Sequence, residues 1–314
     1  MGEILFPGID PVLIDFPGPI DIRWYGLMYL VGFVVAHYLL VRLCRSGFLP
    51  LAEEKVSDLI LYLILGVMLG GRIGYILFYD PALLWPLNRI IQVWKGGMSF
   101  HGALIGISIA TWLFARRNKI PLLKLFDSMA LVGPPGLFFG RWANFINGEL
   151  FGRVAGKGVP WAMRFPTDPI AAQLLGLRRL GKRDQELRIM QALKDGEWLR
   201  IKDQVPLRHP SQIYEALTEG LLLFLILWGI YRSRQKKGKP LSTGTYAALF
   251  LLGYGVFRFI IEFYRQPDPQ LGLVLWSFSR GQELCFLMIL AGILILWFRR
   301  GKGGPSTNPE GHRG

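Results

Sequence analysis

Residues 24–41 read WYGLMYLVGFVVAHYLLV, a stretch of 18 residues without Asp, Glu, Lys or Arg. A helix of this length crosses a hydrocarbon core about 30 Å thick. Apolar stretches of about the same length recur along the chain, at 58–78, 99–115, 125–143, 213–231, 243–263 and 281–298. The pattern predicts an all-α polytopic membrane protein with seven transmembrane helices.

The composition points the same way. Of 314 residues, 52% are hydrophobic and only 18% are charged, which excludes a disordered chain and weighs against an ordinary soluble enzyme. A net charge of +14 is also typical of proteins that bind nucleic acid, but here the Lys and Arg residues occur in short clusters between the apolar stretches. We therefore expect the lipid bilayer, and no nucleic acid, as a partner. The two cysteines are interpreted as packing residues.

The orientation follows from the basic residues beside the stretches. With the N-terminus outside and the C-terminus inside, the short inner segments hold 16 Lys and Arg and the short outer segments hold 4. The first 22 residues have no Lys or Arg, unlike a cleavable signal peptide, and are expected to be a retained tail. The domains expected are 1–143 (tail and helices one to four), 144–212 (outer loop and head), 213–298 (helices five to seven) and 299–314 (cytoplasmic tail).

The sequence predicts a broken helix in the fourth stretch and an amphipathic helix in the head. Gly133–Pro134–Pro135–Gly136 interrupts the fourth stretch, so we expect a broken helix there, and a broken helix often marks a site. In the head, residues 178–202 carry apolar positions at roughly helical spacing, which predicts a short amphipathic helix; those positions are Leu180, Leu187, Met190, Leu193 and Leu199.

Ionisable side chains at membrane depth are costly and indicate function by default. Arg258 and Glu262 lie in the sixth stretch at positions i and i+4, where they are either a simple ion pair on one helical face or part of a site. We favour function for Arg258. The densest polar cluster follows the fourth stretch and suits a phosphate, because Arg offers a planar fork of donors and Gly lets the backbone approach. The alternative is a capped helix end; the residues are Arg141, Asn144, Asn147, Glu149, Gly152 and Arg153.

His101 follows a Gly-Gly turn and begins an outer-facing helix in GGMSFHGALIG. A neutral imidazole there accepts a proton. The alternative is that His101 only positions a tyrosine or a lipid headgroup by hydrogen bonding. No histidine has metal-ligand spacing, so we expect no metal site.

Four segments together resemble one family. The pattern G-R-x-x-N-F-x-N-x-E-x-x-G is present without a gap from Gly140 to Gly152, and an HGG-like segment begins at His101 with Ala103 in place of a glycine. HPSQIYEA (209–216) and FRFIIEFYRQPD (257–268) are also similar to family segments. With these features the chain resembles the prolipoprotein diacylglyceryl transferases of bacterial inner membranes. The likeness runs from Arg23 to Glu283 and thins over 166–205, where the head is longer and more basic than expected.

The resemblance implies a multi-pass protein of the bacterial cytoplasmic (inner) membrane that needs no cofactor. It implies transfer of the diacylglyceryl group of phosphatidylglycerol to the lipobox cysteine thiol of a preprolipoprotein, with release of glycerol phosphate. It implies His101, Arg141 and Arg258 as catalytic residues. The substrate-binding residues that it implies are Tyr25, Asn144, Asn147, Glu149, Gly152, Arg153, Tyr254, Glu262 and Arg265.

Three other classes of protein are weighed against this one. A transporter for an anionic solute also has broken helices and buried arginines, but it should show internal repeats, and the sequence has none. A phospholipid synthase using a nucleotide-activated lipid needs an Asp-rich metal motif, whereas the aspartates here are isolated. A non-catalytic scaffold is weaker still, because it leaves the polar residues in the apolar stretches unexplained.

Overall fold

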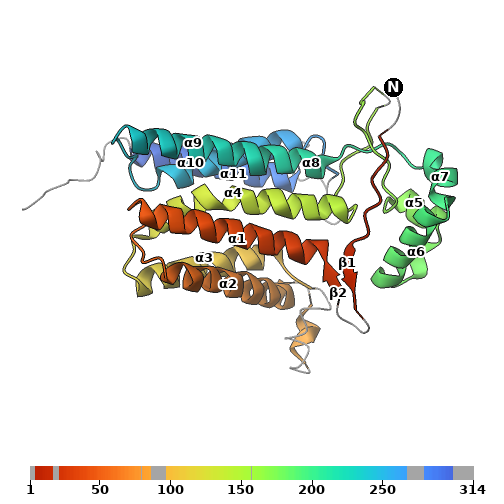
Figure 1. The fold of residues 1–314 in the computed structure, drawn as a ribbon, viewed down its shortest axis with the longest axis horizontal. Coiled ribbons are helices and arrows are strands. Elements are labelled where there is room, and N and C mark those ends of the chain that lie inside the picture. The colour runs from red at the N-terminus through yellow and green to blue at the C-terminus, as the bar shows by residue number, and fades with distance from the viewer. Residues whose placement is uncertain are drawn as a thin grey trace, which may run out of the picture.

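A computed structural model describes residues 4–16, 21–78, 80–85, 97–156, 158–266 and 279–299 (Figure 1). Helices occupy all seven apolar stretches that the sequence predicts. They are α1 (Trp24–Arg45), α2 (Lys55–Phe78), α3 (Phe100–Arg117), α4 (Leu122–Ile146), the continuous run α8 (Ser211–Glu215), η6 (Ala216–Leu222) and α9 (Leu223–Lys236), then α10 (Thr245–Ile261) and α11 (Arg280–Arg299). The predicted cytoplasmic tail, 299–314, lies outside the described residues except for Arg299.

The remaining elements are short. The head contains α5 (Pro169–Leu174), η4 (Leu177–Arg179), α6 (Lys182–Lys194), α7 (Glu197–Ile201) and η5 (Lys202–Gln204), and a 3₁₀ turn, η1 (Pro81–Leu84), follows α2. The N-terminal segment forms an antiparallel pair of strands, β1 (Val12–Asp15) and β2 (Asp21–Arg23), in which Ile14 lies opposite Ile22. The fold is therefore mostly helical, which agrees with the predicted all-α class, with one small pair of strands in addition.

Within the described residues, five helices are long and apolar enough to cross a membrane: Trp24–Arg45, Lys55–Phe78, Leu122–Ile146, Ser211–Lys236 and Gly281–Arg299. Helix α10 is apolar but shorter, with 17 residues. The outer surface of the bundle is itself apolar: Leu61, Leu65 and Leu69, one turn apart on α2, are 54%, 45% and 60% exposed. So much exposed apolar surface marks a protein that resides in a membrane.

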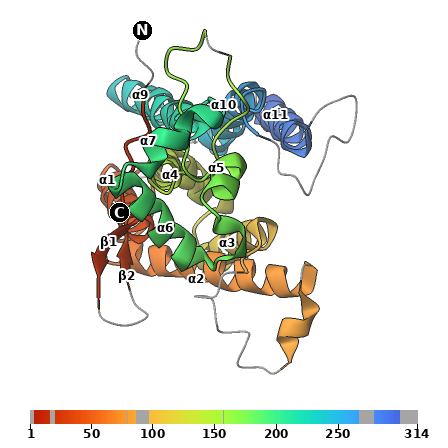
Figure 2. The same cartoon turned by 90° about the vertical axis from the view of Figure 1, so that its right-hand side faces the viewer.

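The long helices lie side by side along the longest axis of the molecule, and the head with the β1–β2 hairpin projects from one end (Figure 1). Seen from that end, α4 lies near the centre of the bundle, between α1 on one side and α10 on the other (Figure 2). The C-terminal ends of α4 and α10 and the N-terminal end of α8 all meet at the head end. Residues that are far apart in the chain therefore lie together at the head end of the bundle.

Helix α4 is continuous from Leu122 to Ile146, although Pro134 and Pro135 lie inside it. The predicted break is wrong. A proline removes a backbone donor but is tolerated where neighbouring helices enclose the segment, and both prolines are buried. Helix α1 passes close by, because a Cβ on Gly32 would lie 3.5 Å from the Cα of Gly136.

Helices α2 and α3 pack through facing glycines. A Cβ on Gly74 would lie 2.6 Å from the Cα of Gly102, and a Cβ on Gly70 would lie 2.6 Å from the Cα of Gly106. Small residues at intervals of four let two membrane helices approach with their backbones almost in contact. The stripe fixes the position of α3, and with it the position of His101.

Replacing Gly106 by leucine is expected to force these helices apart, because the new side chain meets the backbone of Gly66 and Gly70. Overpacking of this kind costs about 1–3 kcal/mol. We expect the melting temperature in detergent to fall by several degrees. The control is Ser108→Leu, which adds similar bulk at an exposed position of the same helix. Equal melting temperatures for the two variants would contradict the proposed packing.

The N-terminal segment packs against the head and forms an ion pair with it. Phe6 packs against Phe145 and Phe165, and the Arg23 guanidinium forms a two-pronged pair with Glu186 of α6 at 2.9 and 3.0 Å. This carboxylate raises the pKa of Arg23, so the contact is ionic across the ordinary pH range. The described part of the N-terminal segment thus packs against the head, and its retention stays a prediction.

The amphipathic segment predicted at 178–202 is helical, as α6 and α7, but its buried face differs from the prediction. Leu180, Leu187 and Leu199 are exposed. Of the predicted positions, Leu193 packs against the core of the head, and the fully buried contacts come from Ala192 and Trp198, which pack against α5 and the chain that follows it. The segment is also divided at Gly196, where a left-handed backbone (φ +70°) starts a new helix, so Leu199 lies on α7 and not on the helix that carries Leu187.

Candidate active site

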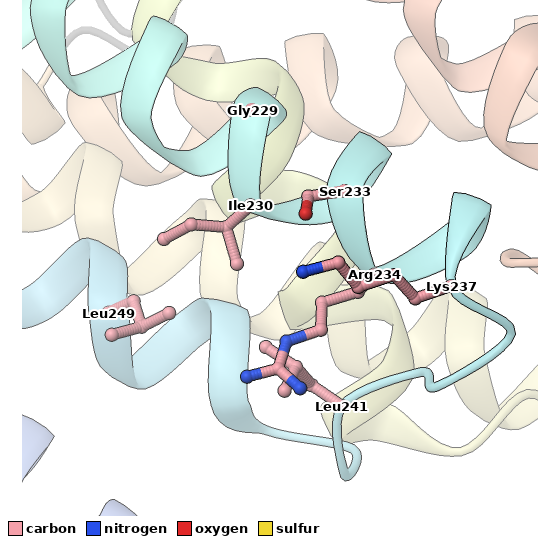
Figure 3. Close-up of a pocket in the computed structure, with 7 residues that line it drawn as sticks. All are labelled: Gly229, Ile230, Ser233, Arg234, Lys237, Leu241 and Leu249. Atoms are coloured by element: carbon pink, nitrogen blue, oxygen red, sulfur yellow. The ribbon is translucent and has the colours of Figure 1, made fainter.

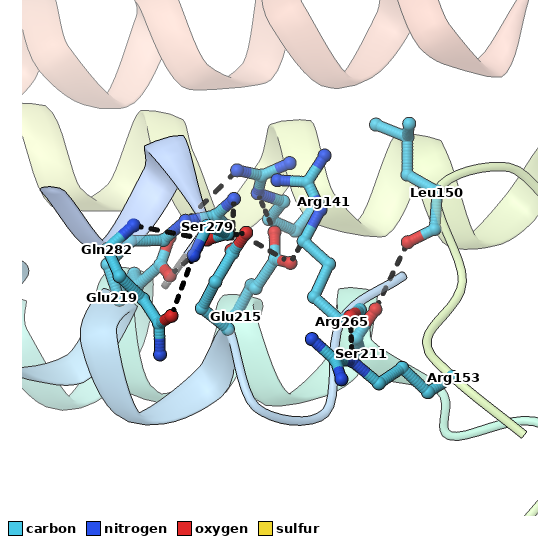
Figure 4. A network of polar contacts seen from close by, with 11 residues as sticks. Arg141, Leu150, Arg153, Ser211, Glu215, Glu219, Arg265, Ser279 and Gln282 are labelled. Carbon is cyan, nitrogen blue, oxygen red and sulfur yellow. Dashed lines mark hydrogen bonds and ion pairs between the residues drawn. The ribbon is translucent and has the colours of Figure 1, made fainter. Parts of the chain in front are cut away.

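A buried carboxylate, Glu215 at the end of α8, is the centre of the polar cluster (Figure 4). Its Oε2 lies 2.6 Å from Nε of Arg141 on α4, and its Oε1 lies 3.2 Å from Nη1 of Arg258 on α10. The Nε of Arg265 is 4.0 Å from the same Oε1. Arg141 and Arg258, 117 positions apart in the chain, thus meet at one carboxylate.

Two further carboxylates complete the cluster. Glu219 lies 3.6 Å from Nη1 of Arg258 and 4.0 Å from Nη2 of Arg141. Glu262 lies 3.2 Å from Nη2 of Arg258 and accepts a hydrogen bond of 2.9 Å from the hydroxyl of Ser279. The i, i+4 pair of Arg258 and Glu262 is therefore present, and it belongs to the larger cluster rather than standing alone.

The arginines, and not the glutamates, are the groups that a ligand can reach. The side chains of Arg141 and Arg258 are 19% and 11% exposed, whereas those of Glu215 and Glu219 are 1% and 0% exposed. Each guanidinium has five N–H donors in a fixed fork. Held from behind by carboxylates, the two arginines can direct their remaining donors toward an anion, which suits a phosphate better than a cation or a neutral sugar.

The helix that carries the glutamates is locally wound as a π-helix, Ala216–Leu222, between α8 and α9. Such turns are rare and occur often at functional sites. Gly220, inside it, lies against α4, since a Cβ there would be 2.7 Å from the Cα of Phe138. This close approach lets Glu215 and Glu219, four residues apart, both face Arg141.

The turn after α4 is held together by its own side chains. The amides of Asn144 and Asn147 both donate to Oε1 of Glu149, at 3.0 and 3.2 Å, and Gln212 donates to the Glu149 carbonyl at 2.7 Å. The Tyr25 hydroxyl interacts with the Asn144 amide and with Tyr29, 3.4 Å away. These bonds agree with the interpretation as a satisfied helix end, while the interpretation as a phosphate site stays a prediction.

Gly152 is required by packing. A Cβ at this position would lie 2.8 Å from the Cβ of His209 and would also meet the carbonyl of Tyr264. The backbone N–H of Gly152 donates to the His209 carbonyl at 2.8 Å, and Nε of Arg153 donates to the Arg265 carbonyl at 2.9 Å. The first bond ties the signature segment to the chain just before α8, and the second ties it to the chain just after α10. Burial lowers the pKa of His209, which keeps its imidazole neutral beside the Tyr214 hydroxyl.

Two other predicted site residues, Tyr254 and His101, lie on α10 and α3. Tyr254 on α10 lies close enough to Glu219 and Arg258 to interact with them electrostatically. His101 lies on a different helix, in the first turn of α3, and its side chain is exposed. The described ion pairs of the cluster do not include His101. Its role as a base stays a prediction.

Glu215 and Glu219 were missed by the sequence analysis, which singled out charged residues only at the fourth and sixth stretches. Both glutamates belong to the fifth apolar helix, at positions i and i+4. The rule that singled out Arg258 applies equally to them. Gln212 was also missed, and a polar residue at a helix start carries no comparable indication.

Comparison with known proteins identifies the family. The family model described as prolipoprotein diacylglyceryl transferase matches residues 11–298, most of the chain. The chain belongs to the prolipoprotein diacylglyceryl transferase family. The resemblance predicted from the Gly140–Gly152 pattern is thereby confirmed.

Curated members of the prolipoprotein diacylglyceryl transferase family match along nearly their whole length. A phosphatidylglycerol–prolipoprotein diacylglyceryl transferase of Neisseria meningitidis is 45% identical over 293 residues, covering 93% of this chain and 96% of the relative. A protein of the same name from Erwinia tasmaniensis is 44% identical over 301 residues, covering 95% of this chain and 95% of the relative. Another from Nitratidesulfovibrio vulgaris is 43% identical over 306 residues, covering 97% of this chain and 98% of the relative. None of these relatives is named a transporter, the alternative that the sequence left open.

Proposed function

We propose that this protein transfers the diacylglyceryl group of phosphatidylglycerol to the lipobox cysteine thiol of a preprolipoprotein, forming a thioether and releasing glycerol phosphate. The names of its relatives support both substrates. The observation that carries the proposal is the convergence of Arg141 and Arg258, from α4 and α10, on the one carboxylate of Glu215.

The chemistry requires this kind of site. The thiolate attacks the glyceryl carbon that bears the phosphate ester, and the carbon–oxygen bond breaks. The electron pair stays on the phosphate oxygen, so the departing glycerol phosphate gains negative charge. Two guanidinium groups fixed in place beforehand stabilise that charge, and they do so more strongly in a water-poor site than in solution. The scheme calls for no metal and no cofactor.

The proposal places all seven helices across the bacterial cytoplasmic (inner) membrane, with the N-terminus and the head, 144–212, outside and the C-terminus inside. The basic residues support this orientation, since they end the helices opposite the head: Arg42 and Arg45 on α1, Arg116 and Arg117 on α3, and Arg234 and Lys236 on α9. Positive charge is enriched on the inner side of membrane proteins. The arginine cluster then lies toward the outer leaflet, where both substrates reach it from within the bilayer.

The remaining substrate-binding assignments are part of the proposal. We place the headgroup against Arg141, Arg258 and Arg265, with Glu262 and Tyr254 fixing the direction of Arg258. On the other side of α4, Tyr25 and the Asn144–Glu149 turn line the approach, and Gly152 and Arg153 hold that turn to α10. His101 is proposed as the base that takes the thiol proton.

Purified protein incubated with phosphatidylglycerol and a synthetic lipobox peptide tests the function directly. We expect mass spectrometry of the peptide to show one added diacylglyceryl group on the cysteine, and glycerol phosphate to appear in equal amount. A peptide with serine in place of the cysteine is the control and should stay unmodified. An unchanged cysteine peptide, with the protein monodisperse and folded, would refute the proposed function.

His101→Gln separates the two hypotheses for this histidine. A thiol has a pKa of about 8.5, so solvent supplies more thiolate as the pH rises. If His101 is the base, the variant is expected to lose most activity near pH 7 and to regain part of it by pH 9. The measurement is the ratio of variant to wild-type rate between pH 6.5 and 9.5. A constant ratio across this range would assign His101 a positioning role only.

The basic residues of the head are expected to act on lipid access rather than on bond-making. Some of them are already paired within the head, as Arg188 is with Glu197 and Arg208 is with Asp168. Arg178 and Arg179 in η4 and Lys182, the first residue of α6, are exposed. Each attracts anionic headgroups by about 1 kcal/mol near a membrane surface.

Replacing Arg178, Arg179 and Lys182 together by glutamine is therefore expected to raise the KM for phosphatidylglycerol in vesicles several-fold and to leave kcat unchanged. Kinetics at two salt concentrations check this, because the difference should shrink as salt screens the charges. An unaltered KM at low salt would show that the head is only a cap.

A further inference from the structure

A cavity of about 570 Å³ lies at the end of the bundle opposite the head (Figure 3). It is bounded by the last turns of α9, by the loop that follows, and by α10. The lining residues are Gly229, Ile230, Ser233, Arg234, Lys237, Leu241 and Leu249. A volume of this size is in the range of small-molecule sites in proteins.

The lining is divided into two chemical parts. Ile230, Leu241 and Leu249 form an apolar wall, while Ser233, Arg234 and Lys237 supply donors at the end of α9 (Figure 3). No carboxylate is among the described lining residues, and no ion pair of Arg234 or Lys237 is found in the part of the chain that the structure describes. A cavity with an apolar wall, two cations and a hydroxyl has the chemistry of a phosphate ester attached to hydrocarbon.

Gly229 supports the same interpretation. It lies within α9, where glycine weakens a helix, yet a Cβ at this position would meet nothing within 4 Å. Packing against another helix therefore does not account for glycine here. The absence of a side chain at Gly229 leaves the cavity open beside Ile230.

The cavity is separate from the proposed active site. Glu215 and Lys237 lie 22 residues apart on one continuous helical run, which corresponds to about 33 Å along its axis. A phospholipid in one leaflet cannot reach both ends. The cavity and the arginine cluster thus face opposite leaflets.

We propose that this cavity binds an anionic phospholipid of the leaflet opposite the active site, with its phosphate between Arg234 and Lys237 and the upper part of its acyl chains against Ile230, Leu241 and Leu249. Basic pockets between membrane helices on the cytoplasmic side are suited to such headgroups. The bound lipid joins α9, which continues the helical run from Glu219 in η6, to α10, which carries Arg258, and it is not a substrate. The binding does not depend on the reaction proposed above.

Native mass spectrometry of the full chain, titrated with dioleoyl phosphatidylserine in detergent, tests this site without any use of activity. The double variant Arg234→Gln/Lys237→Gln is compared with Lys236→Gln/Lys239→Gln, which removes the same charge from neighbouring exposed residues that do not line the cavity. A third variant, Gly229→Leu, fills the cavity and leaves every charge in place. All three must elute as monodisperse protein.

We expect the cavity double variant and Gly229→Leu each to lose one bound lipid per chain, with at least a ten-fold weaker apparent Kd. The control double variant should bind as the wild type does, and any lipid at the arginine cluster should be unaffected in all of them. Equal binding by every variant would overturn the proposal. An equal loss in both double variants would also overturn it, since the effect would then be diffuse surface charge.

Two competitors identify the source of the phosphate. Dioleoyl phosphatidylcholine, with the same chains but no net charge, should bind at least ten-fold more weakly than phosphatidylserine at this site. Inorganic phosphate at 10 mM, roughly the concentration of abundant cellular anions, should not displace the lipid. If inorganic phosphate displaces the lipid, and if the Gly229→Leu variant still binds phosphate, the cavity is a site for free phosphate and not for a lipid.

Discussion

Replacing Arg258 by lysine is expected to lower kcat/KM for diacylglyceryl transfer by at least about 100-fold, which is about 2.7 kcal/mol of transition-state stabilisation. The guanidinium contacts Glu215, Glu219 and Glu262 through two of its nitrogens and still has donors left for a phosphate. A lysine ammonium is a single point with three donors and cannot replace this fork. Arg141→Lys is expected to have an effect of similar size.

The control for these variants is Arg117→Lys, since Arg117 lies exposed at the far end of α3, where it donates to the Tyr62 hydroxyl. Its rate should equal that of the wild type. The fall in rate should also appear in kcat, because the arginines act on charge that develops during the reaction. If both Arg141→Lys and Arg258→Lys transfer lipid at near-normal rates, the arginines do not hold the phosphate.

Glu215→Gln is expected to damage both stability and activity. The glutamate side chain is 1% exposed and lies between Arg141 and Arg258, and glutamine keeps its shape but loses its charge. Removing one partner of a buried ion pair costs about 3–5 kcal/mol, because it leaves buried charge uncompensated. We expect a melting temperature lower by roughly 5–10 °C and transfer reduced by about 100-fold or more.

Two measurements separate these effects. The exposed residue Glu53, paired with Arg45 at 2.8 Å, gives the matched control Glu53→Gln, which should change neither property. Saturating phosphatidylglycerol should recover part of the melting temperature of Glu215→Gln, because its phosphate then supplies negative charge to the two arginines. A variant with wild-type melting temperature and rate would show that Glu215 does not organise the cluster.

The positions of the long helices could be predicted from the sequence because each is an unbroken apolar stretch that must be shielded from water. The residues Arg141 and Arg258 could be predicted because a charge within such a stretch is costly. Their meeting point could not, since it depends on the π-helical turn at Ala216–Leu222 and on the close approach of Gly220 to α4. Local sequence contains no comparable indication of that geometry.

Other parts of the fold were predicted incorrectly or not at all. The break expected at Pro134 and Pro135 is absent, because burial between neighbouring helices compensates for the missing backbone donors. The β1–β2 hairpin was not foreseen, since strands of four and three residues leave too little alternation to detect. The structural role of Asp127 was not foreseen: it accepts hydrogen bonds from the backbone N–H groups of Gly244 and Ala247 and caps the start of α10.

The most direct test of the central claim is a structure of the full chain with bound phosphatidylglycerol, or with its phosphonate analogue, which cannot react. We predict that the phosphorus atom lies within about 4 Å of guanidinium nitrogens of both Arg141 and Arg258, as two charge-assisted hydrogen bonds require. The glyceryl carbon of the diacylglyceryl half should face the bilayer side of the cluster, open to a thiol. A phosphate bound away from either arginine would contradict the account.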